Sequence, residues 1–406
     1  MTVSVAPASR EKPRIRRGFA ALWASTIVSS VGDGAYVVAA PLLAAFLTRD
    51  PIAVATVSAA SAAPWFVVGI WSGAVVDRFP RRQVLVLSEV VRALGLAVLV
   101  ALILLDIASI AALAATSFLV VTGQCFSDAA AQAMLPHVVG RSQDDLTKAN
   151  GRIFAGETVG KTLAGPPLGG LTFSAAPWAP FALDSASFLA SAGLVMRVPS
   201  SPPPDASEQS VAAAVKEGFS YLLRDRTLLL LAFCLTVYNL AYNLAAATLV
   251  LFATKSLGVT ELGFGLLIAA AAVGAAVAGW VAAPLVRRVT LKGSVVAACL
   301  VQGVAWLGVA ASSSPWVAGA AFVLLGATST LVTVAVVTAR QQLVPDHLLG
   351  RVVSAFRLVG NGAAPIGAMA GGLIAASAGL RAPMVAAAVF TAGAMAVLSP
   401  LLYRRA

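Results

Sequence analysis

The sequence predicts an all-α membrane protein of about twelve transmembrane helices, arranged as two pseudo-symmetric six-helix bundles. Hydrophobic residues make up 59% of the 406-residue chain and charged residues only 11%, and the mean hydropathy is +0.89. A soluble domain carries about 25% charged residues, so this chain lacks the charge needed to cover a water-facing surface. Long apolar runs recur from end to end, and each can cross about 30 Å of hydrocarbon.

Hydropathy, with Gly, Pro and charged residues as boundaries, predicts six spans in each half of the chain. The first six cover residues 20–47, 52–76, 83–105, 107–127, 150–173 and 177–196. The last six cover 227–252, 262–286, 291–311, 315–339, 351–377 and 382–403. The expected domains are an N-terminal cytoplasmic segment (1–19), an N-terminal bundle (20–196), a central loop (197–226) with a short amphipathic piece, a C-terminal bundle (227–403) and a tail (404–406).

Positive charge predicts the direction of the spans. With the N-terminus in the cytoplasm, 22 Lys and Arg residues fall in inside segments and three, Arg49, Lys255 and Arg381, fall outside. We therefore expect a multi-pass membrane protein with both termini cytoplasmic and no cleaved signal peptide. The net charge of +11 is explained by topology and contact with anionic membrane lipids. The basic residues separate apolar runs and form no single basic face, which argues against nucleic acid as a partner.

The two halves of the chain resemble each other at an offset of about 200 residues. LPHVVGR (135–141) ends span four and VPDHLLGR (344–351) ends span ten, which places His137 and His347 at matching positions. Val-Gly-Lys at 159–161 corresponds to Val-Gly-Asn at 359–361. A six-plus-six duplication is typical of transporters whose binding site lies between two related halves.

Two motifs link the chain to a known family. Gly73-Ala-Val-Val-Asp77-Arg78-Phe-Pro-Arg81-Arg82, between spans two and three, resembles the signature loop of the major facilitator superfamily. Gly165-Pro166-Pro167-Leu168-Gly169-Gly170, in span five, resembles the antiporter motif of its drug and metabolite exporters. The segments 29–34 and 183–188 resemble the bacterial subgroup that includes the enterobactin exporter and macrolide efflux proteins.

The resemblance implies a secondary transporter that exports small organic molecules (a drug, siderophore or secondary metabolite) by proton antiport with alternating access. The expected partners are the substrate, protons and membrane lipids, and we expect a monomer without cofactor or metal and without enzymatic activity. Span five departs from the motif at Lys161, which replaces its first glycine, and span four lacks the arginine common in proton-coupled drug antiporters. These departures leave the coupling ion open.

The loop between spans two and three is expected to act as a gate. Gly73 has no side chain, so span two can approach a neighbouring helix closely. Asp77 lies at the membrane edge, where its carboxylate can meet the positive end of a helix dipole. The resemblance implies that this helix is span eleven, with Arg351 at its start adding an ion pair. The arginines Arg78, Arg81 and Arg82 complete this loop, and the alternative is that they only enforce topology.

Ionisable residues inside spans are costly unless they are paired or face water. The proton-coupling candidates are Asp33, Glu157 and Asp184. Glu157 and Lys161 are four residues apart, so they are expected to pair on one helix face. Asp33 has no partner within its own helix, so we expect Asp33 to carry the proton and Glu157–Lys161 to serve structure or substrate charge. The alternative is that the aspartates only hold helices together.

Polar residues in three spans are candidates for the substrate cavity: Lys161, Tyr238, Asn239, Tyr242, Asn243, Arg357 and Asn361. Aromatic rings with a few amide groups suit a broad amphipathic ligand, although Asn and Tyr also join helices to one another. Gly165, Pro166, Gly169 and Gly170 are expected to serve close helix packing, with the prolines kinking span five. Cys125, Cys234 and Cys299 are widely spaced and are expected to be packing residues.

Other function classes fit less well. Uptake of a nutrient by the same fold remains the nearest alternative, and a receptor or scaffold without transport is a further one. An intramembrane enzyme would need a nucleophile–base or metal constellation, and the sequence holds only two histidines and no HExxH or GxSxG motif. It also lacks GxxxxGK[ST], which argues against drive by ATP.

The charge distribution makes the topology testable. A reporter fused after Arg82, Lys216 or Arg405 should report the cytoplasm, and one fused after Asp50 or Lys255 should report the outside. A reversed pattern at two or more of these sites would contradict the twelve-span arrangement.

Overall fold

The computed structural model describes residues 12–140, 142–199 and 211–403. Parts of the expected N-terminal segment and central loop, and the tail, lie outside this range. The first half consists of α1 (Lys12–Leu47), α2 (Pro51–Val67), α3 (Gly69–Val76), α4 (Arg81–Leu104), α5 (Ile110–Val139), α6 (Gln143–Glu157), a π-helical segment η1 (Thr158–Ala164), α7 (Gly165–Ala175) and α8 (Ala179–Val195).

The second half begins with the amphipathic helix α9 (Val211–Arg224), which lies where the central loop was expected to contain one. It continues with α10 (Arg226–Ala246), α11 (Leu249–Lys255), α12 (Glu261–Val289), α13 (Leu291–Ala311), α14 (Pro315–Leu343), α15 (Asp346–Gly362), α16 (Ala364–Ala378) and α17 (Ala382–Tyr403). Within the described ranges, nine helical stretches are long and apolar enough to cross a membrane. Three further crossings come from α2 with α3, from α6 with η1 and α7, and from the 17-residue α8.

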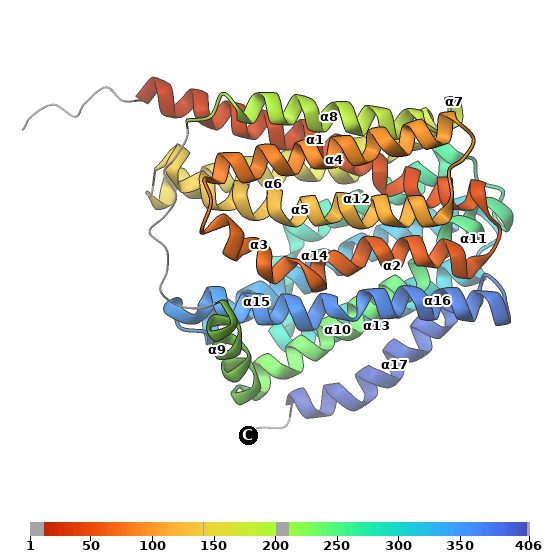
Figure 1. Cartoon of the computed structure of the whole chain (residues 1–406). Coiled ribbons are helices and arrows are strands. Elements are labelled where there is room, and N and C mark those ends of the chain that lie inside the picture. Colours follow the sequence, from red (N-terminus) through yellow and green to blue (C-terminus); the bar gives the residue numbers. More distant parts are fainter. Residues whose placement is uncertain (1–11, 141, 200–210, 404–406) are drawn as a thin grey trace, which may run out of the picture.

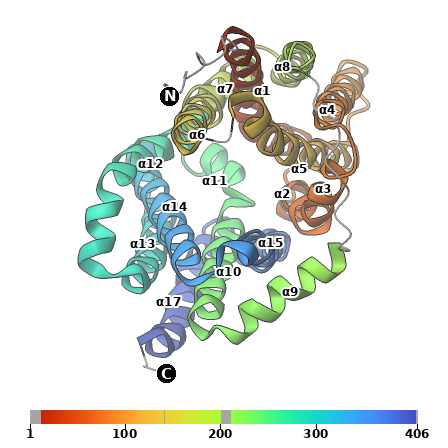
Figure 2. The same cartoon turned by 90° about the vertical axis from the view of Figure 1, so that its left-hand side faces the viewer.

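The helices form two bundles (Figures 1 and 2). In the first, α1 packs against α7 and α8, and α4 packs against α5 and α8. In the second, α14 packs against α12 and α13, and α10 packs against α16 and α17. The predicted all-α fold of two six-helix bundles is confirmed. The main difference in the spans is at span four, because α5 continues from the expected end at residue 127 to Val139.

Spans five and eleven are interrupted at equivalent places. α7 begins at Gly165 with Pro166 and Pro167 in its first turn, and α16 begins at Ala364 with Pro365 in its first turn. Proline has no amide hydrogen to donate, and the first turn of a helix is where this costs least. A new helix therefore begins at each proline, and the preceding residues lie at a break in the span.

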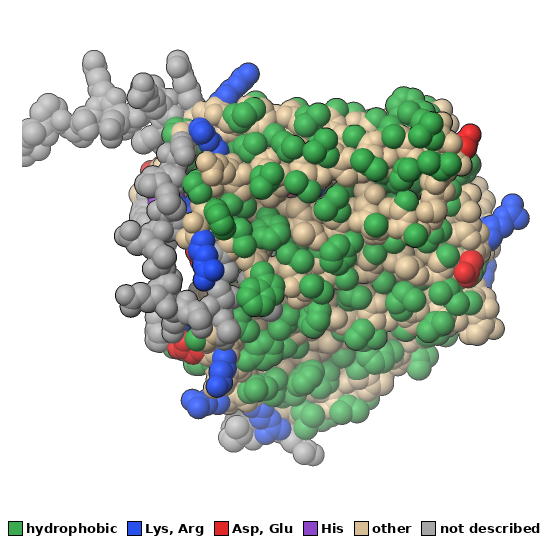
Figure 3. Space-filling view, in the orientation of Figure 1, with side chains coloured by type: hydrophobic (Ala, Val, Ile, Leu, Met, Phe, Trp, Pro, Cys, Tyr) green, Lys and Arg blue, Asp and Glu red, His purple; other side chains and the backbone are tan. Residues whose placement is uncertain are grey.

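The two ends of the bundle differ in charge. Lys and Arg side chains gather mainly at the left-hand end of Figure 3, and the flank between the ends is hydrophobic. We call this the basic end; it contains α9, the loop between α3 and α4, and the loop between α5 and α6. The opposite end contains the connections from α1 to α2, α11 to α12 and α16 to α17.

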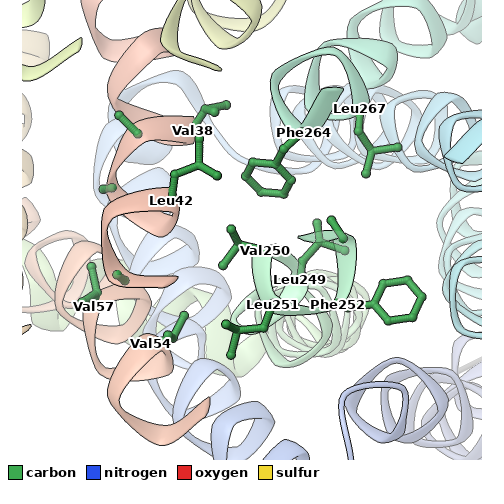
Figure 4. Close-up of a cluster of buried hydrophobic side chains, with 14 of the residues drawn as sticks. Val38, Leu42, Val54, Val57, Leu249, Val250, Leu251, Phe252, Phe264 and Leu267 are labelled. Carbon is green, nitrogen blue, oxygen red and sulfur yellow. The ribbon is translucent and has the colours of Figure 1, made fainter. Parts of the chain in front are cut away.

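The two bundles are pressed together near the opposite end. A Cβ on Gly170 of α7 would lie 2.3 Å from the carbonyl oxygen of Glu261 in α12, and a Cβ on Gly372 of α16 would lie 2.4 Å from Ala55 of α2. Only glycine permits such approach. A buried apolar cluster lies beside these contacts and is shown in Figure 4. We call this cluster the seal. It joins Val38, Leu42, Val54 and Val57 of the first bundle to Leu249, Val250, Leu251, Phe252, Phe264 and Leu267 of the second.

At the basic end the bundles stand apart. α3 packs on α2 and α5, and α6 packs on α1, α5 and η1, all within the first bundle. Asp77 is exposed, and a Cβ on Gly73 would meet no described atom within 4 Å. The expected close approach at Gly73 is therefore absent from this conformation. Arg351 forms an ion pair with Glu217 of α9, where contact with Asp77 had been expected, because α15 and α3 belong to separated bundles.

This asymmetry predicts unequal chemical access. In a background where Cys125, Cys234 and Cys299 are replaced by Ala, Gln132→Cys should react rapidly with a maleimide dye, because Gln132 is exposed. Val250→Cys should react at least about tenfold more slowly, because Val250 is buried in the seal and must open first, at a free energy of about 1.4 kcal/mol or more. Equal rates in the purified protein would show that the seal is not closed.

Candidate functional site

A polar cavity of about 180 Å³ lies inside the first bundle, between its middle and the basic end. We call it the acidic cavity. Its charged lining residues are Asp33 of α1, Glu89 and Arg92 of α4, Asp128 of α5, Glu157 of α6 and Lys161 of η1. Hydroxyl and amide side chains complete it, including Ser25, Thr26, Ser29, Ser30, Gln124, Ser127, Gln132, Asn150 and Ser191.

Arg92 holds the centre of the charge cluster. Its guanidinium donates to Asp33 of α1 and lies 3.4 Å from Oε1 of Glu89 one turn away. The guanidinium also stacks over the ring of Phe188 in α8, 3.8 Å from the ring centroid. Arg92 is 1% exposed, so these contacts replace water around a buried cation.

The premise that Asp33 is unpaired is therefore wrong. Its partner stands on another helix, 59 residues along the chain, where spacing within one helix cannot reveal it. A carboxylate held by a buried guanidinium is suited to joining α1 to α4, and it is a weaker candidate for a proton carrier than an unpaired carboxylate.

One of the two carboxyl oxygens of Glu89 lacks a hydrogen-bond donor among the described residues. Its Oε1 accepts a hydrogen bond of 2.7 Å from the Ser127 hydroxyl. Its Oε2 has no hydrogen-bond partner among the described residues, and Glu89 is only 2% exposed. Leaving a buried charged oxygen unsatisfied is costly, so Glu89 would gain from a donor group of a ligand in the cavity that it lines.

Glu157 and Lys161 both line the cavity but form no ion pair within 4 Å in the described structure. The expected i,i+4 pair is therefore a wrong prediction. Glu157 is the last residue of α6, and Lys161 lies in η1. A π-helix bonds each residue to the fifth along the chain, so the α-helical spacing behind the prediction does not apply across this boundary. Both side chains remain available to a ligand.

Asp184 is sealed away from the acidic cavity. It is fully buried in α8, and its Oδ1 accepts a 3.2 Å hydrogen bond from Ser187. A Cβ on Gly32 of α1 would lie 2.1 Å from the same oxygen, so the carboxyl group fills the space that the glycine leaves. In this conformation Asp184 serves contact between α1 and α8, which argues against its candidacy for proton coupling.

Sequence reasoning missed Asp128. It lines the cavity from α5 and lies within electrostatic range of Lys161, Asp33, Arg92 and Arg357. The predicted fourth span ended at residue 127, so Asp128 lay just outside it and was not considered as a site residue. The apolar residues on both sides of FSD (126–128) were the signal that could have placed it inside the membrane.

A second cavity, of about 470 Å³, lies between the two bundles, and we call it the interface cavity. Its lining comprises Ser58, Ser61, Ala62 and Trp65 of α2, Asn239 and Asn243 of α10, Arg357 and Asn361 of α15, and Ala364 of α16. Four of the predicted substrate-cavity residues thus come together here, at the break in span eleven. Lys161 instead lines the acidic cavity.

The asparagines shape this break. Nδ2 of Asn239 donates to the carbonyl oxygen of Gly360 at 2.9 Å and to Oδ1 of Asn361 at 3.1 Å. Nδ2 of Asn243 donates to the backbone oxygen of Asn239 at 2.8 Å. Asn239 therefore holds the end of α15 against α10, which fixes where Arg357 and Asn361 face.

Tyr238 and Tyr242 lie off the cavities, contrary to expectation. Tyr238 is 5% exposed, and its hydroxyl lies 3.1 Å from that of Thr328 in α14. The Tyr242 ring packs edge-on against Trp306 of α13, with centroids 5.8 Å apart. Neighbouring residues on an α-helix point about 100° apart, so the Asn pair and the Tyr pair of α10 face different partners.

The remaining predicted residues serve helix contacts or the basic end. Gly165 and Gly169 of α7 lie against Gly34 and Ala35 of α1, and Pro166 lies against Gly265 of α12. Within the loop at the basic end, Arg78 is exposed, Arg81 is buried, and Arg82 donates to the backbone oxygen of Val198 at 3.3 Å.

Comparison with known proteins agrees with this geometry. Residues 8–404 match the model of a family described as transmembrane secretion effector. The multidrug efflux pump Tap of Mycolicibacterium fortuitum is 27% identical over 394 residues, which cover 93% of this chain and 94% of that protein. An MFS-type transporter of Bacillus subtilis (strain 168), YfiS, is 27% identical over 398 residues, covering 90% and 89%.

Solved structures share the fold. An inward-facing, unoccupied bacterial homologue of the human lysosomal transporter Spinster has a TM-score of 0.75 at 16% identity, covering 97% of this chain and 98% of that one. The nucleoside transporter NupG has a TM-score of 0.73 at 9% identity, covering 96% and 100%. The fold, the cavities and a family match over nearly the whole length lead to one conclusion. This chain belongs to the transmembrane secretion effector family of the major facilitator superfamily, and it is a multi-pass membrane transporter and not an enzyme.

Proposed function

We propose that this transporter exports small organic molecules, such as a drug, siderophore or secondary metabolite, in exchange for protons. The observation that carries the direction is the likeness to a multidrug efflux pump, at 27% identity over 93% of the chain. The description of the matching family as a secretion effector supports the same direction.

Alternating access follows from the asymmetry of the two ends. The proposal places the basic end in the cytoplasm, since Lys and Arg favour that side, with a monomer in a bacterial inner membrane. The conformation open at the basic end then receives substrate from the cytoplasm. Parting the seal and bringing Asp77 towards the start of α15 would turn the same cavities to the outside.

Proton coupling is assigned to Glu157 in preference to Asp33. Asp33 is held by Arg92, whereas Glu157 lines the cavity without an ion-pair partner within 4 Å among the described residues. The charged groups that surround Glu157 are Asp128, Lys161 and Asp33. Each proton that moves inward supplies about 2.3 kcal/mol per 100 mV of membrane potential, which can drive a substrate outward.

Import remains the second candidate. The fold is shared with a nucleoside transporter, and the geometry of the cavities is compatible with either direction. Transport of a fluorescent amphipathic dye into proteoliposomes with an imposed pH gradient distinguishes export from import. Dye accumulation that requires protons to move in the opposite direction supports antiport. Accumulation that follows the proton in the same direction contradicts it.

The coupling assignment predicts different outcomes for two variants. Glu157→Gln should lose gradient-driven accumulation by at least about tenfold yet retain downhill exchange, because the exchangeable proton is gone while the cavity keeps its shape. Asp33→Asn should instead lower the melting temperature by about 5 °C or more, because removing one partner of a buried ion pair costs about 3–5 kcal/mol. The assignment of proton coupling to Glu157 would be reversed if a stable Asp33→Asn protein lost gradient-driven transport and the Glu157→Gln protein kept it.

The gate proposal predicts a distinct effect at Asp77. Asp77→Asn should lower transport by about fivefold, the result of losing about 1 kcal/mol of helix-terminus interaction in the state closed at the basic end. Membrane abundance should stay normal, because Asp77 is exposed in the open state. Labelling of a cysteine at position 132 should rise. Unchanged labelling with full transport would rule out the gate.

A further inference from the structure

The acidic residues inside the membrane-spanning segments are confined to the first bundle. Five acidic residues lie within spans, and all belong to the first bundle: Asp33, Glu89, Asp128, Glu157 and Asp184. The spans of the second bundle carry acids only at helix starts, Glu261 and Asp346. The charged and amide side chains that they contribute to the interface cavity are those of Arg357, Asn239, Asn243 and Asn361. A ligand that touches both cavities therefore meets carboxylates on one side and donors on the other.

The division is sharpest at two equivalent positions. Glu157 and Arg357 are separated by 200 residues, the offset of the duplication, and each lies near the break in its span. Glu157 lines the acidic cavity and Arg357 lines the interface cavity. Asp128 lines the acidic cavity and lies within electrostatic range of Arg357, so the two cavities are neighbours. The duplicated positions thus present opposite charges to the centre of the protein.

The acidic cavity lacks positive charge for its carboxylates. Four carboxyl groups line it, and Arg92 and Lys161 are its two cations. The buried Oε2 of Glu89 has no hydrogen-bond partner among the described residues. An ammonium group supplies both the missing charge and the missing donors. The described residues hold no group of three His, Cys, Asp or Glu arranged for a metal ion, which favours an organic cation.

Cavity size limits what enters. The acidic cavity of about 180 Å³ has room for about six water molecules at about 30 Å³ each, enough for an ammonium group and a short chain. The interface cavity of about 470 Å³ can hold a ring system beside Trp65. Arg357 and the asparagines there offer N–H donors to carboxylate or carbonyl oxygens.

We propose that the transported molecules are dipolar amphiphiles, each bearing an ammonium group and, across an apolar body, a carboxylate or similar oxygen acceptor. The ammonium group binds in the acidic cavity at Glu157 and Glu89, and the acceptor binds Arg357 in the interface cavity. This inference rests on the proposed transport function and names its substrate class.

Four fluorescent probes with one body test the proposal. Nα-dansyl-lysine carries the ammonium and the carboxylate at opposite ends of its four-methylene chain, dansylcadaverine lacks the carboxylate, Nα-dansyl-Nε-acetyl-lysine lacks the ammonium, and N-acetyl-dansylcadaverine lacks both. Binding to the purified full-length protein in detergent is measured by fluorescence anisotropy. Nα-dansyl-lysine should bind about tenfold more tightly than either probe that lacks one group, since each charged hydrogen bond contributes such a factor.

Two variants assign the groups. Glu157→Gln should remove the preference for the ammonium probes and leave the preference for the carboxylate. Arg357→Gln should do the converse. Asp144→Asn and Arg288→Gln, which change exposed charges on α6 and α12, should alter neither preference and serve as controls. A variant that unfolds would also lose binding, so the melting temperature of each variant is recorded in parallel.

Equal affinity for all four probes, or binding of none, would overturn the proposal. So would variants that weaken all four probes alike, because this pattern indicates loss of structure and not loss of a charge contact. Transport is scored separately. If a proton gradient drives the probe that lacks both groups as well as it drives the other three, proton-coupled export is supported and the dipolar substrate class is rejected. If the protein binds the probes according to their charged groups but a proton gradient does not drive their transport, the dipolar substrate class is supported and proton-coupled export is rejected.

Discussion

The free-energy cost of placing a charged group in the hydrocarbon of the membrane determines how the charged residues of this protein are arranged. Of the 28 Lys and Arg residues, only Arg92, Lys161 and Arg357 lie deep within spans, and each lines a cavity. Each such charge costs several kcal/mol unless it is paired or hydrated, so these three mark the polar interior of the protein. Arg92 meets the requirement by pairing with Asp33 and Glu89. This pairing joins α1 to α4 and forms one wall of the acidic cavity.

Close packing at the opposite end complements this polar interior. Gly170 and Gly372 bring backbones of the two bundles together, and the seal excludes water beside them. Contacts of this kind rely on shape and carry no charge, so they can part and re-form without leaving an ion unpaired. At the basic end, Arg351 of α15 pairs with Glu217 of α9, and because both belong to the second half of the chain this ion pair does not join the two bundles. The seal thus joins the bundles in this conformation, and in the proposed alternating access it would part while the basic end closes.

The sequence predicted the fold well because hydropathy, charge and proline act locally. Span limits, the duplication and the breaks near Pro166 all follow from nearest neighbours in the chain. The site was predicted less well because its contacts are between helices. Asp33 finds Arg92 on another helix, and the π-helical turn separates Glu157 from Lys161. Asp128 was missed because the predicted span ended at residue 127 whereas α5 continues to Val139, and an acidic residue within an apolar run resembles the end of a span.

The breaks in spans five and eleven connect motion to chemistry. Glu157 and Lys161 lie just before the start of α7, and Arg357 and Asn361 lie just before the start of α16. α7 and α16 are the segments that meet the other bundle at Gly170 and Gly372. In the proposed alternating access, a change at the seal would therefore act directly on the helix ends that carry the cavity-lining charges. Because the half-helices are not continuous, these charged ends could reorient while the apolar halves remain packed. The prolines would thus place the proposed substrate-facing groups at the joints of the moving parts.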